Sequence, residues 1–456
     1  MLSIDTAGPD QKPGFDQSLA GSGSRRLTLR MNFLWTLSGN VVYAACQWGI
    51  LVVLAKLGTA QMVGEFALAL AVTAPIVIGT GLHLRSVQAT DAASEYRFGD
   101  YLSLRLLTTG AAGLVIIGIV WFSGYGRHTG AIILIVGLAK GFESISDIFY
   151  GLLQQHERMD RIALSMIIKG LLSLGAIAGV VYLSGDLLLG VCSLAVTWGL
   201  ILAFYDFRSG ASVLRTASDL EHPTIGFCSG LARLLQLHWR PRALVTLALL
   251  ALPVGIVMAL ISFNANIPRY FIAQHLGTRE LGIFAALAYP LAAGTTVVSA
   301  LGQSATPRLA RHYADNDYRA FSSLIRKLLC LGLAIGMGGI LLIWLAGRPI
   351  LLLLYQPEYA GRAGVFLWLG IAAGIGYVAS LLGFGMTAVR YFRAQLPVFL
   401  TVTLVTALGC AVLVPRHQLS GAAIATILAA ICQAVGSAAV IVHALRNRKV
   451  KCRSLN

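Results

Sequence analysis

Charged residues are scarce in this chain. Only 12% of its 456 residues are Asp, Glu, Lys or Arg, whereas a soluble globular domain carries about 25%. Hydrophobic residues make up 57%, and they occur in runs of about 20 residues, the length of a helix that crosses a bilayer. The alternating pattern of an outer-membrane β-barrel is missing. The composition therefore excludes an ordinary soluble globule and predicts an all-α polytopic membrane protein.

Cysteine and histidine are too thinly spread to build a site. The seven cysteines include no C-x-x-C pair, and the nine histidines are dispersed along the chain. A disulfide framework or a thiolate metal site needs characteristic cysteine spacing, and a zinc site needs clustered ligands. We therefore expect neither a metal nor another cofactor.

Apolar runs between polar breaks predict twelve membrane spans, because each run can cross the bilayer as a helix. The first run extends to Leu57, which is too long for the core of a signal peptide, so we expect it to be a retained span. The predicted limits are 31–56, 64–84, 102–122, 130–152, 162–182, 187–207, 247–275, 281–303, 328–347, 361–385, 397–414 and 420–443.

Acidic residues are rarer than basic ones, with 19 Asp and Glu against 35 Lys and Arg and a formal charge of +16. Such an excess can indicate nucleic-acid binding, but in membrane proteins Lys and Arg collect in cytoplasmic loops. If both termini are cytoplasmic, most of the 35 basic residues, Arg85 and Arg105 among them, fall on the inner side. The charge therefore predicts a membrane protein with cytoplasmic termini and no nucleic-acid partner.

Two segments of the chain repeat one another. LAKLGTAQMVGEFALALA at 54–71 and IAQHLGTRELGIFAALAY at 272–289 both contain L-G-T, a short polar linker and G-x-F-A at the start of an apolar helix. Internal repeats are typical of transporters whose binding site lies between two halves. We expect a disordered basic N-terminus at 1–30, an N-lobe of six helices at 31–207, a cytoplasmic linker at 208–246, a C-lobe of six helices at 247–443 and a basic cytoplasmic tail at 444–456.

The linker contains a candidate amphipathic helix. Phe227, Leu231, Leu234 and Leu235 fall on one helical face within GFCSGLARLLQLHWRPRA. This pattern is typical of a helix that lies on the inner leaflet. A merely solvated linker explains it equally well, and both interpretations stay open.

Three charges lie inside the fourth predicted span, GLAKGFESISDIFYG at 137–151. The spacing of Lys140, Glu143 and Asp147 places them on one helical stripe, which must face protein or a watery cavity rather than lipid. In an antiparallel hairpin, Lys169 of the fifth span reaches a depth between Glu143 and Asp147. Two hypotheses remain: a structural network that pairs Lys140 with Glu143 and Asp147 with Lys169, or the polar wall of a transport cavity.

The seventh span is also unusually polar. In ISFNANIPRYFI, Arg269 follows Asn264, Asn266 and Pro268 and lies about 10 Å inside the outer end of the span. A snorkelling arginine at the membrane interface is one interpretation. The other is that Arg269 and Lys140 are cationic centres for an anionic head group, since both residue types bind phosphate. Glu143 and Asp147 are then candidates for coupling to proton or sodium.

Several blocks of the sequence together resemble a known family. LRSVQATDAASEYRFGDYLSLRL, FESISDIFYGLLQQHERMDRIALS, NIPRYFIAQHLGTRELGIFAALAY and GQSATPRLARHYAD are similar to bacterial oligosaccharide flippases of the polysaccharide transporter family, within the multidrug/oligosaccharidyl-lipid/polysaccharide exporter superfamily. The resemblance covers spans one to nine; beyond about residue 330 it is limited to hydropathy and span count.

The resemblance implies two six-helix lobes around a central cavity and alternating access driven by an ion gradient. The implied substrate is an undecaprenyl-diphosphate-linked oligosaccharide, moved between the leaflets of the bacterial inner membrane for surface polysaccharides such as lipopolysaccharide or exopolysaccharide. Membrane lipids, proton or sodium, and a polysaccharide polymerase are the implied partners. Carried over to this chain, the resemblance implies Lys140 and Arg269 as the residues for the anionic substrate. The further candidates for substrate binding, chosen because they are polar or charged within spans, are Lys169, Asn264, Asn266 and Gln47.

The first two spans argue against a peptidoglycan precursor as the substrate. The related lipid II flippases carry arginines there, whereas span one of this chain has only Asn40 and Gln47 in its interior, and span two has His83 and Arg85 at its inner end. Surface-polysaccharide units are therefore the expected cargo.

Two other functions share some of these features. A multidrug or cation antiporter of the same superfamily would need carboxylates such as Glu143 and Asp147 but not the cations Lys140 and Arg269. A membrane-embedded polysaccharide polymerase or glycosyltransferase would need a large external loop with catalytic residues, and every predicted external loop is short. We therefore expect a transporter rather than an enzyme.

Overall fold

The computed structural model describes residues 28–91, 95–218, 240–389 and 391–453, which are almost entirely helical and contain no strand. The first half comprises α1 (Leu29–Leu57), α2 (Ala60–Thr80), α3 (Leu84–Thr90), α4 (Phe98–Phe122), α5 (Arg127–Gln155), α6 (Met159–Ser184), α7 (Leu187–Ile201), the π-helical turn η2 (Leu202–Asp206) and α8 (Phe207–Ser218). The second half comprises α10 (Pro241–Ala288), the 3₁₀ turn η3 (Tyr289–Leu291), α11 (Ala292–Ala314), α12 (Tyr318–Leu354), α13 (Pro357–Ala360), α14 (Ala363–Ala388) and α15 (Phe392–Arg453).

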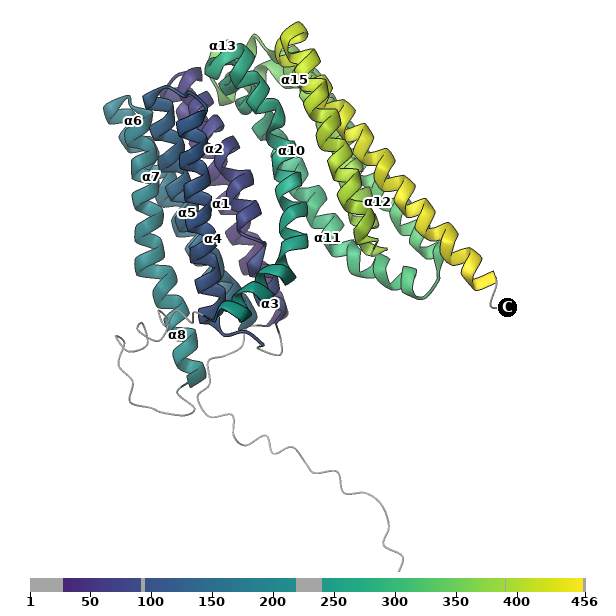
Figure 1. The fold of residues 1–456 in the computed structure, drawn as a ribbon. Coiled ribbons are helices and arrows are strands. Elements are labelled where there is room, and N and C mark those ends of the chain that lie inside the picture. The colour runs from purple at the N-terminus through teal and green to yellow at the C-terminus, as the bar shows by residue number, and fades with distance from the viewer. Residues whose placement is uncertain (1–27, 92–94, 219–239, 390, 454–456) are drawn as a thin grey trace, which may run out of the picture.

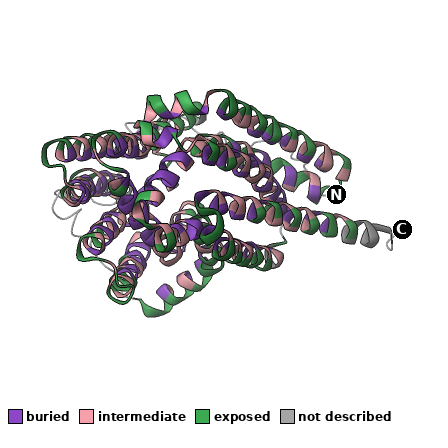
Figure 2. Ribbon diagram, turned by 90° about the horizontal axis from the view of Figure 1, so that it is seen from above, coloured by how far each residue is buried: buried purple, intermediate pink, exposed green. Residues whose placement is uncertain are grey.

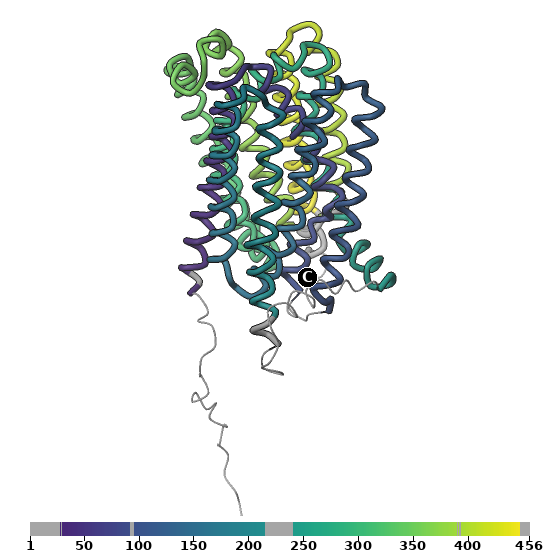
Figure 3. The backbone as a smooth tube through the Cα atoms, turned by 90° about the vertical axis from the view of Figure 1, so that its left-hand side faces the viewer, coloured from purple at the N-terminus to yellow at the C-terminus, as the bar shows by residue number. Residues whose placement is uncertain are grey.

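These helices agree with twelve membrane spans. Within the described ranges, nine helical runs are long and apolar enough to cross a bilayer. The runs at 241–314 and 394–446 each have room for two crossings; α10 bends at Gly277, where φ is +86°, and α15 bends at Gln418, where φ is +51°. The charged helix α5, with 29 residues, is also long enough to cross the bilayer. Figure 3 shows that α1 begins and α15 ends at the same end of the helices, as an even number of crossings requires.

Local capping and turn chemistry move two boundaries from their predicted places. Thr59 accepts a hydrogen bond from the backbone nitrogen of Met62 and starts α2 at Ala60, before the predicted limit of 64, because an N-cap side chain satisfies a free backbone donor. The chain then leaves α2 through Leu82 and His83, both at positive φ. The segment after His83 forms the separate helix α3.

The helices form two lobes. Helices α1 to α8 make up the N-lobe, α11 to α15 lie on the other side, and α10 runs between the two, packed on both α2 and α15. In Figure 1 the lobes meet at the end where α13 lies and diverge toward the end that holds α3 and the C-terminus. The two repeated segments pack against each other at the closed end, where Gly64 of α2 contacts the start of the repeat in α10. The predicted internal repeat thus joins the lobes.

Hydrogen bonds also connect the lobes at the closed end. The Tyr355 hydroxyl donates to the backbone oxygen of Ala286 at 3.0 Å and accepts from the Trp48 indole at 3.4 Å. The side-chain amide of Gln356 donates to the backbone oxygen of Lys56 at 3.2 Å. The segment between α12 and α13 therefore contacts the end of α1.

Exposed apolar side chains identify the lipid-facing surface. Leu114, Trp121, Leu183 and Leu353 are each more than 70% exposed, and Figure 2 shows exposed residues on the outward faces of the helices with buried ones turned inward. A soluble protein does not present apolar surface on this scale. The chain is a multi-pass membrane protein.

Two predicted units differ from the structure at their ends. Helix α8 continues to Ser218 and α10 begins at Pro241, so both ends of the predicted linker at 208–246 are helical. The expected tail at 444–456 is helical as far as Arg453. The candidate interfacial helix with Phe227, Leu231, Leu234 and Leu235 lies outside the described residues.

Candidate functional site

A cavity of about 260 Å³, lined largely by charged and polar residues, lies within the N-lobe. Its walls come from α1 to α6, and it begins near α3, at the end where the lobes diverge (Figure 1). Apolar atoms of Val77, Ile78 and Met166 form part of the wall. The charged residues that line the cavity are Arg85, Arg105, Lys140, Glu143, Asp147 and Lys169, with His83 at the turn before α3.

The predicted charged stripe of α5 faces this cavity. Lys140, Glu143 and Asp147 all line it, while Phe149, on the opposite face of the helix, is fully buried against neighbouring helices. Such a wall avoids the cost of placing ionised groups in lipid.

The predicted pair between Lys140 and Glu143 is confirmed. The Lys140 ammonium lies 2.7 Å from Oε2 of Glu143 and 5.2 Å from the centre of the Trp198 ring. The Tyr43 hydroxyl of α1 donates to Oε1 of Glu143 at 2.7 Å. Both carboxylate oxygens are therefore hydrogen-bonded, and the pair connects α5 to α1.

The predicted pair between Asp147 and Lys169 is wrong. Asp147 pairs instead with Arg85 of α3 at 3.2 Å and with Arg105 of α4 at 3.6 Å. Arg105 is almost fully buried and donates to the Ser144 hydroxyl at 3.2 Å. From the sequence, both arginines count among the basic residues at the inner side that set the orientation in the membrane. In the structure, the turn before α3 and the first turns of α4 carry them into the cavity wall.

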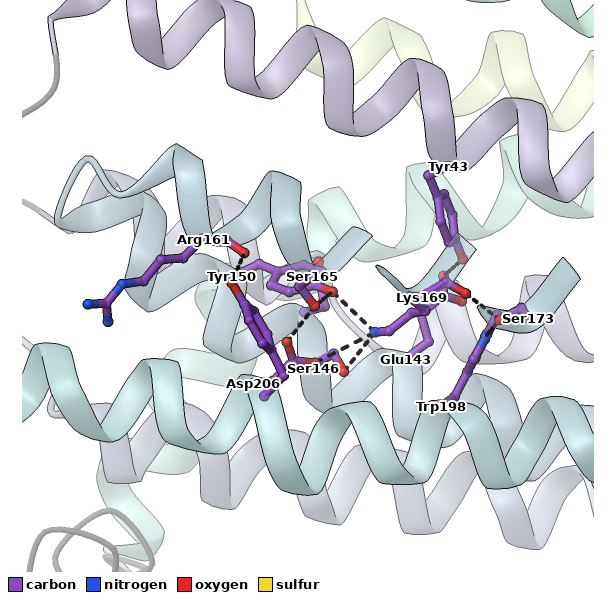
Figure 4. Close-up of polar contacts among 12 residues, drawn as sticks. Tyr43, Glu143, Ser146, Tyr150, Arg161, Ser165, Lys169, Ser173, Trp198 and Asp206 are labelled. Atoms are coloured by element: carbon purple, nitrogen blue, oxygen red, sulfur yellow. Dashed lines mark hydrogen bonds and ion pairs between the residues drawn. The ribbon is translucent and has the colours of Figure 1, made fainter. Parts of the chain in front are cut away.

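Lys169 pairs with an acid that the prediction did not include. Its ammonium lies 3.6 Å from Oδ2 of Asp206 and donates to the hydroxyls of Ser146 at 3.0 Å and Tyr150 at 3.1 Å. Asp206 also accepts from Ser165 at 2.6 Å, and Figure 4 shows these side chains around Lys169. Lys169 is 2% exposed and Asp206 is fully buried. Asp206 ends the π-helical turn η2, a type of turn frequent at functional positions.

The polar residues of α10 lie apart from this cavity. Arg269 donates to Oδ1 of Asn266 at 2.7 Å, and Asn264 accepts a hydrogen bond from Thr406 of α15. None of these α10 residues lines the N-lobe cavity, so the structure does not bring Arg269 and Lys140 into one site there. Gln47 lies one turn beyond Tyr43 on α1 and is also absent from the lining.

Positive charge exceeds negative charge at one end of the cavity only. Lys140 is matched by Glu143 and Lys169 by Asp206, whereas Arg85 and Arg105 share the single carboxylate of Asp147. Two guanidinium groups with one counter-ion form a site suited to an anion, since arginine binds phosphate and carboxylate groups through paired N–H donors.

Comparison with known proteins agrees with the sequence resemblance. The profile of the family "Polysaccharide biosynthesis protein" matches residues 29–313, which ends close to the last of the sequence blocks quoted above. The capsular polysaccharide biosynthesis protein CapF of Staphylococcus aureus is 29% identical over 401 residues, covering 86% of this chain and 94% of CapF.

Solved structures share the fold at low sequence identity. An inward-facing multidrug resistance MATE family transporter of the MOP superfamily aligns with a TM-score of 0.67 at 11% identity, covering 92% of this chain and 99% of that one. The lipid II flippase MurJ in an inward closed conformation aligns with a TM-score of 0.68 at 11% identity, covering 89% of this chain and 86% of MurJ. The chain therefore shares the two-lobed helical fold of these two proteins.

Proposed function

Because the chain belongs to the polysaccharide biosynthesis protein family, we propose that it is a flippase for an undecaprenyl-diphosphate-linked oligosaccharide. It carries this repeat unit from the inner to the outer leaflet of the bacterial inner membrane, where the unit is used for surface polysaccharide. The name of CapF, a capsular polysaccharide biosynthesis protein, supports a surface polysaccharide as the end product.

This proposal rests on one observation: the two guanidinium groups of Arg85 and Arg105 share a single carboxylate, that of Asp147. A diphosphate diester has two negative charges and oxygens that accept paired hydrogen bonds from guanidinium groups. Asp147 already occupies part of the donor set of both arginines, so the diphosphate takes its place. Lys140 and Lys169 have their own carboxylates and contribute less to binding this anion.

The arrangement of the lobes supports loading from the cytoplasmic side. The arginines lie toward the end where the lobes diverge, and the repeated segments close the other end (Figure 1). With cytoplasmic termini, the diverging end faces the inner leaflet. A rocking motion of the lobes then exposes the head group on the outer side, and Glu143 and Asp147 remain the candidates for coupling this motion to proton or sodium.

A cation antiporter is the second candidate, because the fold is also that of the MATE transporters. Both cavity carboxylates, however, are held by cations of the chain: Glu143 by Lys140, and Asp147 by the two arginines. An organic cation would have to displace these partners, whereas an anion has only Asp147 to displace. The site therefore favours the anionic lipid-linked sugar.

The test compares arginine variants in a strain that lacks this protein. Arg85→Gln and Arg105→Gln should reach the membrane but lower surface polysaccharide by about tenfold or more, the loss expected from one charged hydrogen bond of about 1.5–3 kcal/mol. Lipid-linked repeat units should accumulate on the cytoplasmic leaflet. The matched control is Arg158→Gln, since Arg158 pairs with Asp160 at 2.9 Å and does not line the cavity.

Two results would count against this function. Normal surface polysaccharide in both cavity variants would remove the arginines from the substrate site. Efflux of cationic dyes by the wild-type protein, without movement of a lipid-linked sugar in proteoliposomes, would favour the antiporter instead.

A further inference from the structure

The charges along the cavity change from unbalanced to balanced over one turn of α5. At the level of Asp147, two arginines face one carboxylate, while at the level of Glu143 the Lys140 ammonium is matched at 2.7 Å. An anion is therefore attracted to the first level only. At the second level, the cavity presents a neutral ion pair.

Glu143 can accept hydrogen bonds from a ligand at this second level. Its side chain is 30% exposed, and the hydroxyls of Tyr43, Ser144 and Tyr150 belong to the residues that line the same cavity. An ionised carboxylate has about four lone-pair positions, of which Lys140 and Tyr43 use two. The remaining positions suit hydroxyl donors, whereas a second carboxylate would be repelled.

The helix geometry fixes which part of the substrate meets Glu143. Four residues separate Glu143 from Asp147, which corresponds to about 6 Å along the axis of α5. A ring bonded directly to an anion at Arg85 and Arg105 therefore lies against Glu143. The cavity volume of about 260 Å³ is below the ~300 Å³ at which pockets for drug-sized ligands begin, so it accommodates the anion and its neighbouring ring rather than a chain of sugars.

We propose that Glu143 selects an uncharged, hydroxyl-bearing sugar at the position bonded to the diphosphate and rejects an acidic sugar there. This inference rests on the proposed flippase function. It assigns the substrate class as a polyprenyl-diphosphate glycan whose first ring is neutral, while acidic groups on later rings are tolerated because they lie beyond the cavity.

The experiment uses the full-length protein in proteoliposomes and three synthetic undecaprenyl-diphosphate disaccharides. The first has two neutral hexoses, the second a hexuronic acid as its first ring, and the third the same acid as its second ring. We expect the wild-type protein to move the first and third lipids at similar rates and the second about tenfold more slowly, the ratio that corresponds to about 1.4 kcal/mol.

Variants show whether Glu143 is the residue that discriminates between the three lipids. Glu143→Gln, and the double variant Lys140→Met/Glu143→Gln that removes both charges, should raise the relative rate of the second lipid to near that of the first. Glu65→Gln makes the same change at a buried glutamate of α2 that does not line the cavity, and it should keep the wild-type preference.

The outcomes separate this inference from the proposed function. Equal rates for all three lipids in the wild-type protein, or equally slow movement of the second and third lipids, would overturn the selectivity and leave the flippase function in place. Movement of none of the lipids would overturn the flippase function itself. The wild-type comparison is decisive even if a variant fails to fold.

Discussion

Gly64 of α2 and Gly282 of α10 are packed against each other in a nearly symmetrical contact between the lobes. A Cβ atom on Gly64 would lie 1.7 Å from the backbone oxygen of Thr278, and one on Gly282 would lie 1.9 Å from the backbone oxygen of Ala60. Both glycines open the G-x-F-A motif of the internal repeat. Because only glycine permits so close an approach of two backbones, this contact closes the end opposite the arginines.

A larger residue in this contact should open the closed end. In a cysteine-free background with Ser144→Cys in the cavity wall, Gly64→Val should increase labelling by a membrane-impermeant maleimide from outside the cell several-fold, because the valine side chain forces α2 and α10 apart. Gly113→Val is the control, since a Cβ at Gly113 has no atom within 4 Å. Unchanged labelling in Gly64→Val would show that another contact seals this end.

The sequence was sufficient to predict the lobes and the pair of Lys140 with Glu143, but not the partners of Asp147 and Lys169. The repeated G-x-F-A motif and the apolar runs depend on local spacing, which the chain displays directly. The stripe of Lys140, Glu143 and Asp147 was predictable for the same reason, since helical periodicity places these side chains on one face. Both features follow from the period of a helix and not from long-range contacts.

The partners of these charges depend on how distant segments meet. Arg105 lies three residues inside the predicted span 102–122, and Asp206 lies at the end of the predicted span 187–207. The rule that identified Lys140, an ionisable residue inside an apolar run, applies to both. At the end of a span, however, such a residue looks the same in sequence whether it enters a cavity wall or belongs to a loop. Spacing along the chain also could not show that Arg269 of α10 lies away from Lys140.

Asp147→Asn should strengthen the binding of an anionic head group. The carboxylate competes with the substrate for Arg85 and Arg105, and a unit charge about 4 Å away contributes about 1–4 kcal/mol between water and a protein surface. We expect the Kd of undecaprenyl diphosphate for the purified protein to fall about tenfold or more, and transport to slow because release becomes harder.

Salt provides a second measure of this competition. The affinity gained in Asp147→Asn should diminish as ionic strength rises, because the interaction is electrostatic and partly exposed. Asp160→Asn removes a carboxylate that pairs with Arg158 outside the cavity and should leave the Kd unchanged. Weaker binding in Asp147→Asn would mean that Asp147 orients the arginines for the ligand.

Tyr355→Phe should weaken the connection between α12 and the N-lobe. The hydroxyl bonds both the backbone oxygen of Ala286 and the indole of Trp48, and loss of a hydrogen bond costs about 0.5–1.5 kcal/mol. Thermal unfolding in detergent should show a small destabilisation. A double-mutant cycle with Trp48→Phe should give a coupling energy above zero, while strict additivity would show that the 3.4 Å contact contributes nothing.

The buried pair of Lys169 and Asp206 leads to a prediction about fold rather than substrate. Both side chains are almost completely buried, and removing one partner leaves an uncompensated charge, which costs about 3–5 kcal/mol. Lys169→Met or Asp206→Leu alone should therefore lower the unfolding temperature strongly, whereas the double variant should recover much of the wild-type stability, because two apolar residues replace a desolvated pair. If the stable double variant still transports the lipid-linked sugar, Lys169 holds α6 against α7 and η2 and does not bind the head group. If it is stable but inactive, Lys169 acts on the substrate, and the assignment of the anion to the arginines alone is too narrow.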